Sequence, residues 1–244
     1  MSALRGRGGL LIPAAVALAA LAVLLGLGAW QLERKAWKEN LIANLDLRLS
    51  EAPVALPPSA EWAGMTPDDW EFTRVRVPLE FTHAASAHVL TSGSMLRDDV
   101  KGTGYFVFTP ARLADGRQIV INRGFTPDRN RSGAPGSQDI VGAVRFPEAP
   151  SWFVPAHDGA GGTWTVRDPQ GMATMRAWGP VAPFYIEQES PVPPGGVPHP
   201  APLKVRLRND HLQYAITWFG LAAVLVVMFA VWLVKRRREG LAAN

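Results

Sequence analysis

Residues 209–234 read NDHLQYAITWFGLAAVLVVMFAVWLV, and this stretch decides the architecture of the chain. From Ala215 to Val234 it holds twenty residues without a charge, and four basic residues follow directly, from Lys235 to Arg238. A helix rises about 1.5 Å per residue, so such a run covers the roughly 30 Å hydrocarbon core of a bilayer. Because a single apolar segment can satisfy its backbone in lipid only as a helix, the stretch predicts a transmembrane helix over residues 211–234.

A second apolar stretch lies near the start of the chain. Arg5 and Arg7 precede a run rich in Ala and Leu over residues 10–30. A cleaved signal peptide is the alternative, but the apolar part of a signal peptide has about 7–15 residues and ends at a small-residue cleavage site. This run is longer and shows no clear site of that kind. We therefore expect a retained transmembrane helix, with Trp30 at the far membrane interface.

The distribution of charge predicts the topology. Residues 31–210 carry 19 Lys and Arg against 20 Asp and Glu, whereas the two ends carry 6 basic residues against Glu239 alone. Lys and Arg accumulate on the cytoplasmic flanks of membrane helices. The expected organisation is a cytoplasmic N-terminus at 1–9, helices at 10–30 and 211–234, a periplasmic β-rich domain with a juxtamembrane helix at 31–210, and a cytoplasmic C-terminus at 235–244.

Composition argues against several function classes. The basic excess is confined to the membrane flanks, so nucleic-acid binding is not expected. Cysteine is absent, which excludes disulfides, thiolate metal sites and cysteine nucleophiles. The two flanks are too short for a cytoplasmic signalling domain, and two helices are too few for a usual transporter. No nucleophile-elbow, P-loop or dinucleotide-binding motif occurs in the sequence. We expect a protein that is not an enzyme.

The first part of the central segment has a helical pattern, and a strand pattern follows it. Leu32, Trp37, Leu41, Leu45 and Leu49 recur at near-helical spacing, which predicts a helix over residues 31–51. In residues 73–81, apolar side chains alternate with charged ones, as is typical of a half-buried strand.

A β-hairpin is predicted around Asp115-Gly116, because the turn requires a positive φ. Its strands are expected at 104–113 and 117–123, with further strands at 87–91 (pairing with 73–81), 140–146, 163–166 and 183–187. Asp168-Pro169 predicts the start of a short helix that Gly179 ends. The predicted fold is an α+β membrane protein with two transmembrane helices flanking a mostly antiparallel β extracytoplasmic domain.

His211 is the strongest candidate for a functional side chain. It lies about one turn before the uncharged run, and Tyr214 and Trp218 follow it at i+3 and i+7 on one helix face. Ionisable groups at membrane depth are costly and tend to be functional. A neutral imidazole is a good axial ligand for haem iron, and an aromatic surround suits a porphyrin. Arg206 and Arg208 could then neutralise its propionates.

A purely structural interpretation remains open for the same residues. The ring of His211 could simply reach interfacial water, while Tyr214 and Trp218 anchor the helix at the membrane surface. The remaining histidines show no metal-site spacing and are expected to be ordinary surface or loop residues. They are His83, His88, His157 and His199.

Several separated stretches resemble the surfeit locus protein 1 family, which comprises assembly factors for cytochrome c oxidase. They are GAWQ at 28–31 followed by Arg34 and Lys38, GY at 104–105 with TP at 109–110, DG at 115–116, INRG at 121–124, AVRFPE at 143–148, Trp164 with DP at 168–169, and NDHLQYAITW at 209–218. The last stretch is the most specific, and the resemblance covers residues 20–234. Phe125 departs from the family, which more often has Trp after Arg-Gly, although an aromatic is kept.

The resemblance implies a role in maturing the haem a-containing oxidase, by receiving haem a and passing it to the catalytic subunit. His211 would be the axial ligand of the haem iron, with Tyr214 and Trp218 beside the cofactor. Haem a synthase is a further possible partner, besides the lipid bilayer. Because no presequence precedes the first helix, the resemblance points to a bacterial member in the inner membrane.

The family motifs also mark residues that we expect to be structural or to contact partners. They are Gly28, Trp30, Gln31, Gly104, Tyr105, Arg123, Gly124 and Asn209. Arg123 and Gly124 are expected at a hairpin end, and the Trp30-Gln31 pair is expected to pack against residues 209–218. Two alternatives stay open: a scaffold that binds oxidase subunits without haem, and a membrane-anchored periplasmic enzyme that uses the unassigned histidines.

Overall fold

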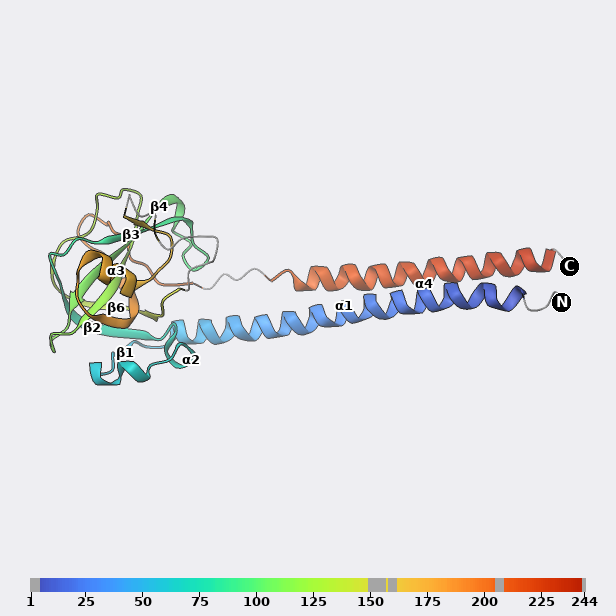
Figure 1. The fold of residues 1–244 in the computed structure, drawn as a ribbon, viewed down its shortest axis with the longest axis horizontal. Helices are drawn as coiled ribbons and strands as arrows, with labels where there is room; N and C mark the ends of the chain where they lie inside the picture. Colours follow the sequence, from blue (N-terminus) through green and yellow to red (C-terminus); the bar gives the residue numbers. More distant parts are fainter. Residues whose placement is uncertain (1–4, 149–156, 158–161, 205–208, 243–244) are drawn as a thin grey trace. The chain divides into compact units, whose positions relative to one another are not determined.

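The computed structural model describes residues 5–148, 157, 162–204 and 209–242 (Figure 1). The chain forms two compact units, one from Met1–Ala43 with Leu207–Asn244 and one from Asn44–Arg206. Two long helices build the first unit, and a β-sheet with short helices builds the second. The predicted class of α+β membrane protein is confirmed, since long apolar helices precede and follow the sheet domain in the sequence.

The helices of the first unit are α1 (Arg5–Ser50) and α4 (His211–Ala242). Both contain segments long and apolar enough to cross a membrane. The two helices run side by side in opposite directions, so the start of α1 and the end of α4 lie at the same end of the pair (Figure 1). The helix expected over residues 31–51 is confirmed, because α1 continues without a break to Ser50.

Among the residues that the structure describes, the second unit has eight strands and three short helical segments. They are β1 (Val54–Ala55), η1 (Ser59–Gly64), α2 (Pro67–Trp70), β2 (Arg74–Phe81), β3 (Ala87–Gly93), β4 (Lys101–Arg112), β5 (Gln118–Thr126), β6 (Gly136–Arg145), β7 (Thr163–Trp164), α3 (Pro169–Arg176) and β8 (Val181–Ser190). Each predicted strand corresponds to one of these, and Gly116 takes the positive φ (82°) that the predicted β4–β5 turn requires.

The strands close into a barrel. Their order is β1-β2-β6-β8-β5-β4-β3-β7, and β2 also pairs with β4. In this second pairing Glu80 lies opposite Arg112, and Phe81 lies opposite Ala111. Because β2 thereby meets both ends of the series β6-β8-β5-β4, these strands form a closed ring, and β3 extends outward from β4.

Two predictions about the sheet are wrong. The sheet is mixed and not mostly antiparallel, since β5 and β8 pair in parallel, as do β1 with β2 and β3 with β7. Between β5 and β8 the chain passes through β6, β7 and α3, and such a long crossover allows β8 to enter beside β5 in the same direction. Residues 87–91 also do not pair with 73–81, because β3 forms an antiparallel pair with β4, the next strand in the chain.

Two large cores and a small third cluster of Phe72, Ala143 and Leu203 hold the described part of the domain together. Every strand of the ring contributes to the first core. From β2, alternate residues such as Val75, Val77 and Leu79 point into it. The second core lies on the opposite face of β4, β5 and β8, where α3 contributes Met172 and Ala173. Burial at about 25 cal/mol per Å² of apolar surface is the main stabilising contribution of both.

Helix α3 covers the second core and begins as predicted. The Asp168 side chain accepts a hydrogen bond from the backbone nitrogen of Gly171 (3.0 Å), and Pro169 occupies the first turn. The helix ends earlier than expected, at Arg176, because Ala177 already takes the left-handed conformation (φ 55°) before Gly179 is reached.

Candidate functional site

The helical unit brings His211 of α4 next to Gln31 of α1. The His211 Nδ1 and Gln31 Oε1 atoms are 2.8 Å apart, which is a hydrogen-bond distance. Since a carboxamide oxygen only accepts, Nδ1 donates in this contact, and in the neutral form of the ring Nε2 then carries the lone pair. In the described part of the chain no hydrogen bond reaches Nε2. The expected packing of Gln31 against residues 209–218 is confirmed.

A glycine lets the two helices come close at this point. Gly28 is buried one turn before Gln31, and a Cβ atom there would lie only 2.7 Å from Cε1 and Cζ of the Phe219 ring. On α4, Ala215 is buried one turn after His211. Small residues at helix contacts in membranes permit close backbone approach. Gly28 therefore keeps Gln31 within hydrogen-bond reach of His211.

The other residues predicted at this site differ in exposure. Trp218 lies on the same face of α4 as His211 and is half-buried, whereas 56% of Tyr214 is exposed. Trp30 is 53% exposed, so the helix contact involves mainly its neighbour Gln31. Asn209 precedes α4, and its buried Oδ1 has no hydrogen-bond partner among the described residues. Arg206 and Arg208, expected near haem propionates, lie outside the described residues.

In the sheet domain, Gly104 and Tyr105 pack β4 against its neighbours. A Cβ atom at Gly104 would lie 2.5 Å from the Phe125 ring and 2.7 Å from the Thr126 carbonyl oxygen on β5. Glycine is thus needed for the aromatic ring to lie across β4. Tyr105 contacts His88 of β3 edge to face, with ring centroids 6.0 Å apart.

Arg123 and Gly124 lie inside β5 and not at a hairpin end as predicted. The strand continues past them because Phe125 pairs with a distant segment: its backbone nitrogen donates to the His199 carbonyl (3.0 Å), and the His199 nitrogen donates to the Phe125 carbonyl (2.7 Å). Gly124 has φ 113°, and a Cβ atom there would lie 2.5 Å from the nitrogen of Pro200 and closer still to His199. The Arg123 side chain is buried, and this burial lowers its pKa to about 10.

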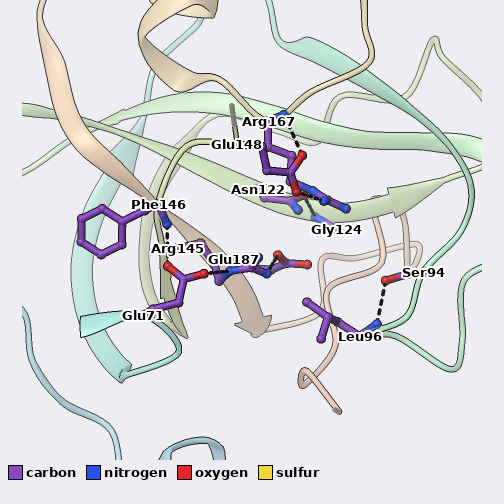
Figure 2. Close-up of polar contacts among 10 residues, drawn as sticks. All are labelled: Glu71, Ser94, Leu96, Asn122, Gly124, Arg145, Phe146, Glu148, Arg167 and Glu187. Atoms are coloured by element: carbon purple, nitrogen blue, oxygen red, sulfur yellow. Dashed lines mark hydrogen bonds and ion pairs between the residues drawn. The ribbon is translucent and has the colours of Figure 1, made fainter. Parts of the chain in front are cut away.

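Sequence reasoning missed a cluster of partly buried ion pairs next to the barrel core. Figure 2 shows Arg145 between two carboxylates: its Nε donates to Glu71 Oε1 (2.6 Å), and its Nη1 lies 3.5 Å from Glu187 Oε2. Arg167 donates to Glu148 beside it (2.5 Å). Glu187 is 3% exposed, so its charge depends on these guanidinium groups.

One sequence signal could have revealed this cluster. Arg145 follows the apolar residues Ala143 and Val144 in its strand, and Glu187 follows the run FYI at 184–186. A charge that replaces an apolar residue in a buried strand requires an opposite charge nearby. The expectation for His88 also fails: it lies in β3 with 6% exposure and is no surface histidine, and its ring packs edge to face on Tyr105, on the strand face opposite Ala87 and Val89 of the second core.

Comparison with known proteins identifies the family. Residues 18–223 match the model of the SURF1 family. The chain is 35% identical to a SURF1-like protein of Monosiga brevicollis over 89% of this chain and 85% of that protein. It is 34% identical to Surfeit locus protein 1 of Homo sapiens, over 81% of this chain and 70% of the human protein. It is also 34% identical to a SURF1-like protein of Drosophila melanogaster, over 86% of this chain and 74% of that protein.

The match spans the whole sheet domain, most of the apolar stretch of α1 from residue 18 on, and the first part of α4 as far as residue 223. The residues that carry the earlier resemblance, from GAWQ at 28–31 to NDHLQYAITW at 209–218, all fall inside it. The chain belongs to the SURF1 family, whose members are known as cytochrome c oxidase assembly factors.

Proposed function

We propose that this protein serves cytochrome c oxidase assembly by holding haem a through His211 and delivering it to the catalytic subunit of the oxidase. The observation that carries the proposal is the hydrogen bond between His211 Nδ1 and Gln31 Oε1 (2.8 Å). Histidines that ligate metals commonly donate their other ring N–H to an oxygen, which fixes the tautomer and raises the basicity of the ligating nitrogen. Gln31 supplies such an oxygen.

The residues around His211 fit a hydrophobic porphyrin as cargo. Tyr214 and Trp218 offer aromatic surface on the first turns of α4, and Ile216 beside them is 64% exposed. Haem a is an iron porphyrin with an apolar tail, and a neutral imidazole nitrogen ligates such iron. A single protein ligand suits transfer, because the cargo must be captured and later released. Gln31 would hold the imidazole in the orientation that accepts it.

The same proposal includes the location and the partners. The basic residues Lys235 to Arg238 favour a cytoplasmic end for α4, which supports a bacterial inner-membrane protein with its sheet domain in the periplasm. The catalytic subunit of the oxidase would receive the haem, and haem a synthase is the proposed donor. The protein would act by binding and release and not by catalysing a reaction.

The deciding experiment is haem a co-purification from cells that make haem a. Wild-type protein in mild detergent is expected to carry haem a, and His211→Ala is expected to lose it or to show a shifted optical spectrum, because the axial nitrogen is gone. His83→Ala is the matched control, since His83 is an exposed histidine of the sheet domain. Equal haem in wild type and His211→Ala would place the ligand elsewhere. No haem in either would favour a scaffold that binds oxidase subunits alone.

Gln31 is predicted to position His211. Gln31→Leu removes the acceptor for Nδ1–H, so we expect haem a to dissociate about 10–100 times more readily. Gln31→Glu keeps an acceptor oxygen and is expected to restore binding, with an altered Soret maximum because a carboxylate makes the imidazole more basic. The measurement is a haem-transfer assay to apomyoglobin with optical detection. Identical rates for Gln31→Leu and wild type would remove Gln31 from the site.

A further inference from the structure

A polar cavity of about 660 Å³ lies in the sheet domain and has no role in the function proposed above. Its walls come from the β2–β3 turn, from β3, β4 and β5, from the loop after β5, and from α3. Its volume is within the range of small-molecule sites, about 300–1,000 Å³. Among the described residues that line it are Arg123, Arg129, Arg176, His83 and His88, and none of these lining residues is an aspartate or glutamate. The lining therefore favours a negatively charged ligand.

Two of the guanidinium groups converge from different elements. A Cβ atom built on Gly162 would lie 3.3 Å from Nη2 of Arg176, on α3, and 3.7 Å from Nη2 of Arg129, in the loop after β5. Arg176 also approaches the Gly162 carbonyl, but at 3.4 Å this is a long hydrogen bond. Both groups are positively charged, so an anion placed between them is attracted by both.

His88 supplies an unused polar atom at the same cavity. It is 6% exposed, and its Nε2 has no hydrogen-bond partner among the described residues. Burial, followed by the positive charges of Arg129 and Arg176, lowers the pKa of His88, so its ring is neutral at pH 7. Buried polar atoms in native proteins are nearly always hydrogen-bonded to protein, water or ligand. Because the other ring nitrogen donates to the Arg131 backbone, Nε2 is an acceptor, and a ligand hydroxyl such as that of hydrogen phosphate would donate to it.

The third guanidinium group is held in place before any ligand arrives. Arg123 lies over the Phe81 ring, with Cζ 3.9 Å from the centroid, and its Nη1 donates to the Ala134 carbonyl (2.9 Å). Gly133 has φ 79°, and a Cβ atom there would lie 2.6 Å from Cζ of Arg123. Only glycine lets the loop close on the guanidinium. Arg123 has no carboxylate partner in the described part of the chain.

We propose that this cavity is an oxyanion-binding site, in which Arg123, Arg129 and Arg176 hold the phosphate or carboxylate group of a small molecule or lipid headgroup and His88 Nε2 accepts a hydrogen bond from a ligand hydroxyl. Guanidinium groups bind both kinds of oxyanion through paired hydrogen bonds. The remaining volume takes the group that carries the oxyanion. The site lies wholly within the sheet domain and is independent of His211.

The test is thermal unfolding of the full chain in a neutral detergent, with tryptophan fluorescence as the readout. The Tm is measured at increasing concentrations of sodium phosphate. Sodium chloride at equal ionic strength separates specific binding from screening. The Tm is expected to rise with phosphate and to saturate, because a ligand that binds only the folded state stabilises it. Arg176→Gln is expected to need at least about tenfold more phosphate for the same rise. Arg117→Gln, an exposed arginine outside the cavity, should match wild type.

The protein without phosphate provides a second readout. Arg176→Gln is expected to leave its Tm unchanged or higher, because its described hydrogen bond, to the Gly162 carbonyl, is long (3.4 Å) and the substitution removes a partly buried positive charge. A fall of the Tm in this variant would show that the guanidinium group serves the fold, and would overturn the proposal. An equal response to chloride and phosphate, or an undiminished response in Arg176→Gln, would overturn it as well.

Two further arms identify the oxyanion and its source. Succinate in place of phosphate reports whether carboxylates bind, and a saturable Tm rise with either anion supports the site. In nanodiscs of phosphatidylglycerol, a lipid ligand would fill the cavity and abolish the phosphate response, whereas nanodiscs of phosphatidylcholine would preserve it. A phosphate response that is equal in both nanodiscs would assign a soluble ligand.

Discussion

Gly124→Ala is expected to destabilise the sheet domain by at least about 3 kcal/mol, because two independent penalties coincide at this residue. At φ 113° the backbone conformation is one that residues with a Cβ atom rarely adopt. The added methyl group would also meet the backbone of His199 and Pro200, which is paired with β5 and cannot move freely. Thermal unfolding in detergent should show a Tm about 6–12 °C below wild type.

Gly116→Ala is the matched control for this substitution. Gly116 also has a positive φ (82°), but no atom lies within 4 Å of its Cβ position, since it occupies the exposed β4–β5 turn. Only the conformational penalty remains there, about 1 kcal/mol. Equal losses in the two variants would mean that the 199–200 segment can move away from β5 at little cost.

Arg145→Met is expected to destabilise the domain by about 3–5 kcal/mol. Arg145 contacts Glu71 (2.6 Å) and Glu187 (3.5 Å), and it covers the Phe72 ring with Cζ 4.5 Å from the centroid. Methionine replaces the packing but leaves the carboxylate of Glu187 buried beside another carboxylate. Urea unfolding at pH 7 would measure the loss, and Glu187→Gln in the same chain should recover part of it.

The control for Arg145 is an exposed ion pair in the same sheet. Arg76 and Asp139 are 3.2 Å apart, and both side chains are more than half exposed. Solvent screens such pairs, so Arg76→Met is expected to change stability by less than about 1 kcal/mol. If Arg145→Met lowered the free energy of unfolding no more than Arg76→Met does, the buried carboxylates would have to be protonated or hydrated in the folded protein.

Local features of this fold could be predicted because each depends on a few neighbouring residues. The twenty uncharged residues of 215–234 require a membrane helix whatever surrounds them, and the alternation in 73–81 gives a strand with one buried face. Asp115-Gly116 likewise determines its own turn. The meeting of Gln31 with His211 was also predictable, since both were assigned to the same membrane interface.

Features that depend on partners distant in the chain could not be predicted. Nothing in the pattern of 183–187 states whether β8 lies parallel or antiparallel to β5, because alternation marks a buried face and carries no direction. Position 124 was correctly expected to require glycine. The reason is that a Cβ atom there would meet the backbone of residue 199, seventy-five positions later in the chain. The arginines around His88 come from separate elements, and only the folded domain brings them to one cavity.

Closure of the barrel has a consequence for how this domain behaves in a crowded compartment. A long unpaired strand edge is a template on which another chain can add, and it promotes aggregation. Here the sheet terminates at both sides in strands of two residues, β1 and β7, and the ring strands pair on both flanks. A domain without cysteine has no disulfide to secure its edges, so ring closure and short terminal strands protect it from self-association.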